Sequence, residues 1–129
     1  MINYGFTKEL GLPFEAAVEA VTAALKKEGF GILTKIDLRE KFKEKLGVEF
    51  RNYVILGACS PANAYKAVQV EQNIGLMLPC NVIVYEKDGK ASVGVIKPSV
   101  AMGGIGNEGL KPLALEVEAM LEKAFTAMK

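Results

Sequence analysis

The sequence predicts a two-layer α+β sandwich, in which a mixed or largely antiparallel sheet has its helices packed on one face. Periodic apolar residues mark strands and helices in the order β-α-β-α-β-α-β-β-α. A hairpin near the end of this order breaks the strict alternation that an all-parallel sheet requires. Half of the 129 residues are apolar, which is enough for one continuous core. We therefore expect residues 1–129 to form a single domain.

The first strand and helix are separated by a turn that ends at Pro13. The strand is expected over residues 2–8, and the helix is expected to end at Gly29, since glycine commonly follows the last turn of a helix. Between the proline and this glycine, apolar residues recur at helical spacing. They are Phe14, Ala17, Val18, Val21, Ala24 and Leu25.

A second strand is predicted over residues 30–36 and leads into a short helix. Asp37 and Glu40 have the spacing of a capping box, in which the first side chain accepts a hydrogen bond from the third helical N–H. Gly47 closes this helix. We expect its apolar side chains to point inward: Leu38, Phe42 and Leu46.

The third strand is a continuous apolar run over residues 53–58. Ser60 and Pro61 follow it, and these residue types are favoured at the N-cap and first position of a helix. The helix that they begin is expected to carry its buried side on Ala64, Tyr65 and Val68.

Two further strands are predicted over residues 81–86 and 91–96. Between them, Asp88-Gly89 is the strongest short hairpin signal available from sequence. A last helix is expected from about Pro112, with one apolar stripe. The stripe consists of Leu113, Val117, Met120, Leu121 and Ala124.

A sheet covered by helices on one side leaves its other face open. The predicted strands are apolar on both faces around residues 54–56 and 82–84. Because a large exposed apolar surface is unfavourable in water, we expect this face to pair with a second copy of the chain in a homodimer.

The charge balance argues against nucleic-acid and membrane partners. Lys and Arg number 16 against 15 Asp and Glu. The densest basic stretch, residues 39–45, alternates with Glu40 and Glu44, which is typical of a solvated helix face. No uncharged run reaches the ~20 residues that cross a bilayer, and the N-terminal residues resemble neither a signal nor a transit peptide. We expect a cytoplasmic protein without either partner.

Cys59 and Cys80 are the only cysteines, and the chain has no histidine, the commonest general base and metal ligand. Cys59 ends a predicted strand just before a helix N-terminus, where the helix dipole favours a thiolate. If the strand over 53–58 pairs with the strand over 81–86, both sulfurs approach one end of the sheet. The candidate binding or thiol site consists of Cys59, Ser60, Cys80 and Asn81.

Several roles are open to these two thiols. Free cysteines are most often small buried hydrophobic residues. A structural zinc site needs four nitrogen or sulfur ligands, which only a site shared across a dimer could supply here. Two thiolates suit a linear soft cation such as Cu(I). We expect neither a cofactor nor a metal site in one chain.

The loop over residues 97–109 contains a G-x-G-x-x-G pattern at Gly104, Gly106 and Gly109. A dinucleotide fingerprint needs a following helix and a further parallel strand, whereas here the chain ends after one helix. Two interpretations remain for this long loop: a connector without fixed structure, or a lid over a cleft. Gly103, Gly104 and Gly106 are the candidate lid residues.

Three segments of the chain resemble, in order, the domain of unknown function family 302. They are GFGILTKID (29–37), FRNYVILGACSP (50–61) and IGLMLPCNV (74–82), and they include both cysteines. The resemblance implies a small prokaryotic two-layer α+β domain and a dimer, without a known activity. The chain departs from the family at EQNIG (71–75), where members often have Asp-Pro before Ile-Gly.

Two functions from different classes follow from these residues. The first is a dimeric module that binds a small molecule or soft ligand near Cys59 and Cys80, with residues 97–109 as a lid. The second is a thiol enzyme or redox protein, in which Cys59 is reactive and Cys80 resolves it. Binding is favoured over catalysis, because without histidine few groups can activate a nucleophile.

Overall fold

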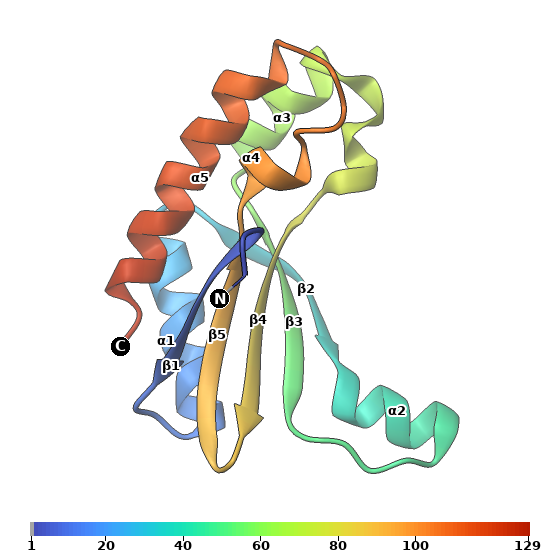
Figure 1. The fold of residues 1–129 in the computed structure, drawn as a ribbon, viewed down its shortest axis with the longest axis vertical. Coiled ribbons are helices and arrows are strands. Elements are labelled where there is room, and N and C mark those ends of the chain that lie inside the picture. Colours follow the sequence, from blue (N-terminus) through green and yellow to red (C-terminus); the bar gives the residue numbers. More distant parts are fainter. Residues whose placement is uncertain (1) are drawn as a thin grey trace.

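Five strands form one sheet in the computed structural model, which describes residues 2–129 (Figure 1). The sheet order is β1-β5-β4-β3-β2, and every neighbouring pair is antiparallel. The strands are β1 (Gly5–Leu10), β2 (Gly31–Asp37), β3 (Tyr53–Cys59), β4 (Cys80–Lys87) and β5 (Lys90–Ile96). The predicted α+β class is confirmed, while position 1 of the predicted domain lies outside the described residues.

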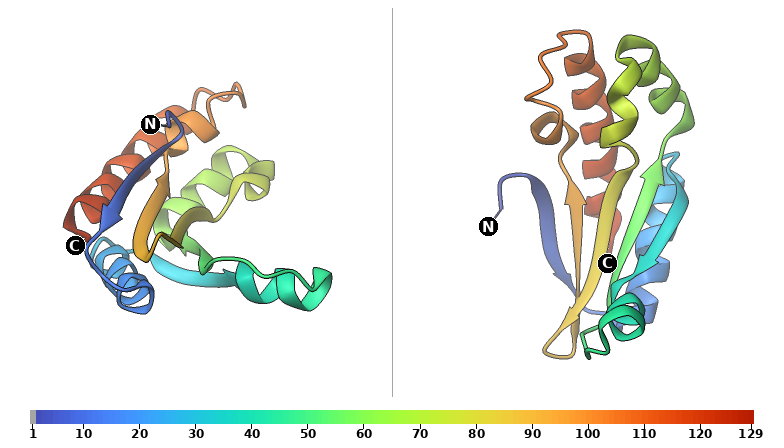
Figure 2. Two further views of the ribbon diagram at one scale, coloured as in Figure 1. Left: turned by 60° about the horizontal axis from the view of Figure 1, so that its bottom comes forward. Right: turned by 90° about the vertical axis from the view of Figure 1, so that its right-hand side faces the viewer.

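The helices lie in two groups. The long helices α1 (Phe14–Lys27) and α5 (Leu110–Ala127) pack against each other and cover one face of the sheet (Figure 2). Shorter elements extend beyond the end of the sheet where β3 ends and β4 begins (Figure 1). These are α3 (Pro61–Val70), the 3-10 helix η1 (Gln72–Met77) and α4 (Pro98–Ala101). Helix α2 (Leu38–Leu46) projects from the opposite end.

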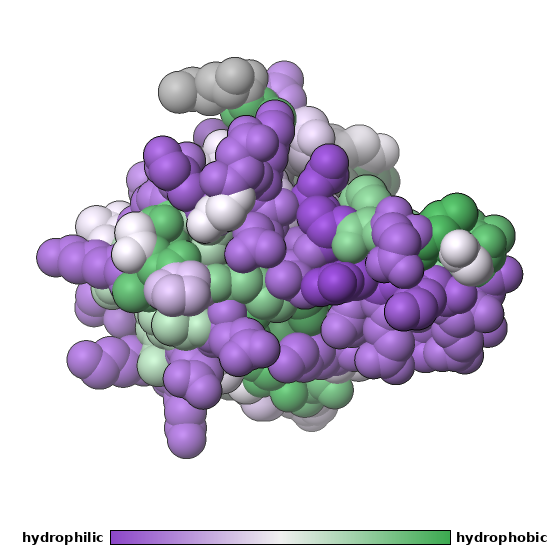
Figure 3. Space-filling view, turned by 90° about the horizontal axis from the view of Figure 1, so that it is seen from below, coloured by the Kyte–Doolittle hydropathy of each residue, from purple (hydrophilic) through white to green (hydrophobic). Residues whose placement is uncertain are grey.

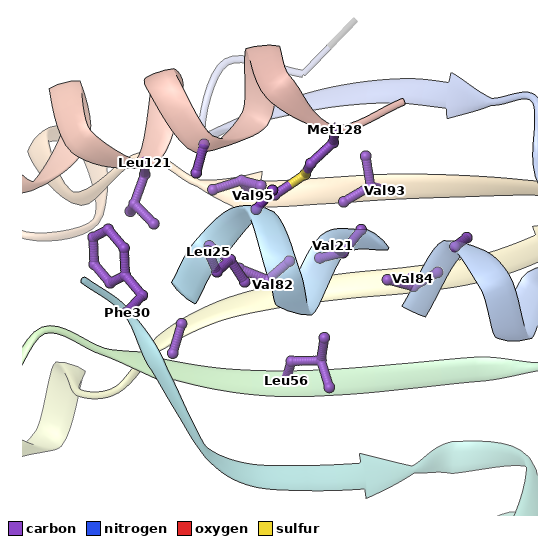
Figure 4. Close-up of a cluster of buried hydrophobic side chains, with 14 of the residues drawn as sticks. Val21, Leu25, Phe30, Leu56, Val82, Val84, Val93, Val95, Leu121 and Met128 are labelled. Atoms are coloured by element: carbon purple, nitrogen blue, oxygen red, sulfur yellow. The ribbon is translucent and has the colours of Figure 1, made fainter. Parts of the chain in front are cut away.

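The main core lies between the sheet and the two long helices, as Figure 4 shows. Side chains alternate along each strand, so every second residue of β3, β4 and β5 points toward the helices. Burying one Leu, Phe or Val side chain contributes roughly 1.5–3 kcal/mol. The core residues labelled in Figure 4 are Val21, Leu25, Phe30, Leu56, Val82, Val84, Val93, Val95, Leu121 and Met128.

Two predicted turn and cap signals are present in the structure. Asp37 caps α2, because its Oδ1 accepts a hydrogen bond from the Glu40 N–H at 3.0 Å. In the β4–β5 hairpin, Asp88 and Gly89 have φ values of 54° and 76°. Two consecutive positive φ angles are what a tight hairpin turn requires, which explains the Asp-Gly pair.

The predicted inward face of α2 is wrong in part: Leu38 and Phe42 are half-buried, and the other residues of the helix are exposed. None of its residues is buried, and Leu46 is 70% exposed. The reason is that α2 follows the edge strand β2 and touches the sheet at β3 without being enclosed by it. Its Phe42 instead packs edge-on against Phe50 in the following loop, with ring centroids 5.1 Å apart.

The predicted buried side of α3 is also wrong in part. Tyr65 is 67% exposed and Val68 is exposed, while Asn63 and Ala67 are buried. Helix α3 packs against α5 beyond the end of the sheet. Because the two helices lie close together, the side of α3 with smaller side chains faces α5. The η1 and α4 helices were not predicted, and α5 begins two residues before the predicted Pro112, at Leu110.

Candidate functional site

A cavity of about 40 Å³ lies beyond the end of the sheet, where residues of α3 and α5 meet those of β3 and β4. Its walls are apolar apart from a serine, an asparagine and two thiols, and no charged side chain lines it. The lining residues are Phe30, Ala58, Cys59, Ser60, Asn63, Ala64, Ala67, Leu78, Pro79, Cys80, Pro98, Met102, Leu110, Leu113, Ala114 and Val117. The opposite end of the molecule is mostly hydrophilic (Figure 3).

Strand register positions both cysteines at this cavity. Cys59 is the last residue of β3 and Cys80 is the first residue of β4, and Ala58 pairs with Cys80 across the ladder. Both are free thiols that line the cavity. Cys59 is half-buried, whereas Cys80 is only 8% exposed. The cavity therefore has one accessible and one enclosed sulfur.

Burial, and to a smaller extent negative charge on Cys59, together raise the pKa of the Cys80 thiol to about 11. The second cause means that the two sulfurs are close enough to interact electrostatically. At neutral pH, Cys80 is a protonated thiol. Protonated sulfur is a poor nucleophile and metal ligand, so Cys80 contributes a small, nearly apolar surface to the cavity.

Ser60 and Asn63 are the polar oxygen- and nitrogen-bearing side chains of the cavity wall. Ser60 occupies the N-cap position of α3, with Pro61 behind it, but its side chain makes no capping hydrogen bond. Asn63 Nδ2 donates to Ser60 Oγ at 3.1 Å and to Met120 Sδ at 3.4 Å. The Asn63 amide thus links the start of α3 to the middle of α5.

Asn81 lies outside this group. It follows Cys80 in β4, so its side chain points to the other face of the sheet, and it is exposed. It is not among the residues that line the cavity. Of the four candidate site residues, Cys59, Ser60 and Cys80 come together at the cavity, and Asn81 does not.

The glycine-containing loop forms a second cavity of about 220 Å³ beside the first. Gly103 and Gly106 line the second cavity, and Gly104 is exposed and lines neither. The two cavities share wall residues, namely Met102, Leu110 and Ala114. The side chains of these residues therefore separate the thiol cavity from the outer one.

Hydrogen bonds hold the loop against neighbouring helices. Asn107 Nδ2 donates to the Val70 carbonyl and to Glu71 Oε1, each at 3.0 Å. At the start of the loop, the Ser99 N–H donates to Glu118 Oε1 at 3.0 Å, and the Ser99 hydroxyl donates to the same oxygen. These contacts fix α4 to α5 and the loop to the end of α3.

Sequence reasoning missed Asn63, Met102 and Met120. Asn63 lies on the side of α3 that carries small residues, at the position four residues before the buried Ala67. This spacing is a signal for a buried polar side chain, but its partner Met120 is 57 positions away in the sequence. Met102 lies in a segment that offers no periodic pattern.

Within residues 2–129, no group of three or more histidine, cysteine, aspartate or glutamate side chains is arranged to hold a metal ion. The same part of the chain contains no helix with the length and hydropathy to cross a membrane.

These features define a small two-layer α+β domain with an apolar, thiol-lined cavity beyond one end of an antiparallel sheet. The chain belongs to the family described as Domain of unknown function DUF302, whose sequence profile matches residues 6–128. It is similar to the uncharacterized conserved protein DUF302 from Bacillus stearothermophilus. That crystal structure matches with a TM-score of 0.91 and 29% identity, covering 99% of this chain and 100% of that one. No curated protein matches the chain in sequence.

Proposed function

We propose that this domain binds a small, largely apolar molecule in the cavity at Cys59 and Cys80. The observation that carries the proposal is a partly open apolar cavity of about 40 Å³ where α3 and α5 meet the end of the sheet. About 10–15 Å³ on this measure is enough for one water molecule, so the cavity has room for a larger guest. Apart from Ser60 and Asn63, the wall offers water no oxygen or nitrogen partner among its side chains, so most of the space suits an apolar group.

Met102 and the loop over residues 97–109 are the proposed cover of the site. Met102 lines both the thiol cavity and the larger outer cavity. Methionine is flexible and adapts its shape to what it contacts. The thiol cavity is already partly open, and a rotation of the Met102 side chain would widen the opening toward the outer cavity without unfolding of α3 or α5.

A xenon titration tests the proposal, because xenon enters dry apolar cavities. The expected result is saturable binding with shifts of the α3 and α5 amide signals by NMR. Ala64 lines the cavity, so Ala64→Leu fills it and should abolish binding. The control is Ala62→Leu, an exposed position on the same helix, which should bind xenon like the unmodified protein. Equal binding by both variants would place xenon elsewhere and contradict the proposal.

The natural ligand should stabilise the fold by mass action. A ligand at a hundredfold excess over its dissociation constant stabilises a folded protein by about 2.7 kcal/mol. A thermal-shift screen of small neutral molecules therefore finds candidates, and only those that lose their effect in Ala64→Leu bind at the cavity.

The rival function is thiol chemistry, with Cys59 reactive and Cys80 resolving. The shared cavity of the two sulfurs favours it, and the raised pKa of Cys80 opposes it, because resolution requires a thiolate. Soft-cation binding meets the same obstacle, since a metal must displace the Cys80 proton. Intact mass after mild oxidation distinguishes the functions. A Cys59–Cys80 disulfide supports the redox function, and two unmodified thiols exclude it.

We also propose that the domain is a cytoplasmic homodimer. Free thiols persist in the reducing cytoplasm, which agrees with two unpaired cysteines. The face of the sheet opposite the long helices carries a row of isoleucines, Ile36, Ile55 and Ile83, paired across β2, β3 and β4. Apolar residues on an uncovered sheet face are stabilised by burial against a second copy.

A further inference from the structure

We infer that the ligand of the thiol cavity is an uncharged molecule with a hydroxyl group, which Ser60 and Asn63 hold by hydrogen bonds. This inference rests on the proposed binding function and names the class of ligand. It begins from the position of Asn63, which is 8% exposed in an apolar wall. Among residues 2–129, no buried side-chain nitrogen or oxygen lacks a hydrogen-bond partner, so any atom of Asn63 without one is in contact with solvent.

The orientation of the Asn63 amide follows from Met120. A thioether sulfur accepts hydrogen bonds and cannot donate them, so the amide group facing Met120 Sδ is NH2. Nδ2 lies 3.4 Å from that sulfur and 3.1 Å from Ser60 Oγ. Both hydrogen bonds of this side chain within residues 2–129 start from Nδ2. Asn63 Oδ1 is therefore a solvent-accessible acceptor without a protein partner, on a residue that lines the cavity.

Ser60 supplies the complementary donor. Its Oγ accepts from Asn63, and its hydroxyl makes no capping bond to α3, so the O–H is available to donate into the cavity. The pair thus offers one acceptor and one donor at neighbouring positions. A ligand hydroxyl donates to Asn63 Oδ1 and accepts from Ser60, so it satisfies both groups at once. A carbonyl or an ether can only accept.

The rest of the wall excludes charged ligands. No acidic or basic side chain lines the cavity, so a carboxylate or an ammonium group would be desolvated without a counter-charge. The protonated Cys80 thiol adds no charge either. The ligand class is therefore a small alcohol with an apolar remainder.

Three matched probes test the inference by NMR titration: 1-butanol, n-pentane and butylammonium. Pentane has a methyl group in place of the hydroxyl, and butylammonium adds a charge. Ser60→Ala should weaken the binding of 1-butanol about threefold to tenfold, which is the net effect of one hydrogen bond. The affinity for pentane should not change. Ser60→Thr keeps the hydroxyl and should restore 1-butanol binding. Butylammonium should not bind at the cavity.

The outcomes separate this inference from the proposed function. If pentane and 1-butanol bind but respond equally to Ser60→Ala, the cavity binds apolar molecules and the hydroxyl assignment is wrong. Butylammonium binding as tight as that of 1-butanol also overturns it. If no probe shifts the cavity signals, the proposed binding function fails, and the inference fails with it. Ser60 makes no capping bond, so both variants are expected to fold.

Discussion

Cys80 links the cavity to the pH dependence of folding. Its pKa is about 11 in the folded protein against 9.0 as the ordinary value. The folded state therefore keeps a proton that the unfolded state loses first. The stabilisation that this tighter proton binding gives the folded state is fully present below pH 9, and it is lost as the pH rises through 11. The shift corresponds to roughly 2–3 kcal/mol, so the free energy of unfolding should fall by about that amount in this window.

Urea denaturation under reducing conditions at several pH values between 8 and 11.5 measures this effect. Tyr53, whose pKa burial raises, and Lys8, whose pKa burial lowers, also titrate in alkaline solution. The control is Cys80→Ala, which keeps these groups and lacks the thiol. The difference between the two proteins should shrink as the pH rises, and a constant difference would show that Cys80 titrates normally.

Gly57 is a position where any side chain disturbs the site. A Cβ atom there would lie 2.6 Å from Pro79 Cγ and would also collide with Thr34 Oγ1. Pro79 lines the cavity, so the collision pushes on its wall. Gly57→Ala should destabilise the protein by about 1–3 kcal/mol, as overpacking does, and weaken ligand binding. Chemical denaturation measures the stability change.

The matched control is another strand glycine with open space around it. No atom lies within 4 Å of a Cβ added at Gly31, which is exposed in the edge strand β2. Gly31→Ala should therefore change the stability by less than about 0.5 kcal/mol. Equal losses in the two variants would mean that the loss at Gly57 does not come from the contact with Pro79.

At the scale of elements, hydrogen bonds from Asn107 hold the loop over residues 97–109 against the end of α3. Asn107→Ala removes its hydrogen bonds to the Val70 carbonyl and the Glu71 carboxylate. Because these bonds are partly exposed to water, we expect a loss of about 1 kcal/mol. Amide hydrogen exchange should accelerate in residues 102–109 and stay unchanged in the sheet.

Asn81→Ala is the control for this variant, since Asn81 is exposed on a strand away from the loop. It should leave exchange in the loop unchanged. Unaltered exchange in Asn107→Ala would show that Met102 and Leu110, rather than Asn107, hold the loop in place. The lid function of the loop would then depend on apolar packing.

The sequence was sufficient to predict the elements that local rules specify. Asp37 caps a helix and Asp88-Gly89 forms a hairpin because the conformation follows from the residues themselves. The face that a helix buries depends on its neighbours, which explains the errors in α2 and α3. Leu46, the last residue of α2, is exposed although the helix contacts β3, and apolar spacing alone carries no information about how far such a contact extends.

Three of the four candidate site residues, Cys59, Ser60 and Cys80, could be placed together from the sequence. The positions of Cys59 and Cys80 at one sheet end follow from the pairing of two adjacent strands, which the apolar runs indicate. The prediction that Asn81 belongs to the same site was wrong, because side chains alternate along β4 and that of Asn81 points to the other face of the sheet. Asn63 and Met120 meet only through the packing of α3 on α5, which no local pattern specifies.

At the scale of the whole molecule, the open sheet face determines whether copies associate. The pairing of Ile36 with Ile55, and of Ile55 with Ile83, places three isoleucines in one row across the strands. The stacked rings of Tyr53 and Tyr85 lie on the same face, with centroids 5.5 Å apart. Neither α1 nor α5 covers this row, since both pack on the opposite face (Figure 2).

Ile36→Lys should therefore convert a dimer into a monomer. Ile36 is 43% exposed in the single chain, so a lysine there is tolerated by the fold, but a charge buried in an apolar interface is not. Leu76→Lys is the control, because Leu76 is 88% exposed on η1, away from the sheet. Sedimentation velocity should give a dimer for the unmodified protein and for Leu76→Lys, and a monomer for Ile36→Lys.

If the unmodified protein sediments as a monomer, the open face is stable in water by itself and the cavity must bind its ligand within one chain. If Ile36→Lys remains a dimer, the copies associate through a surface other than this isoleucine row.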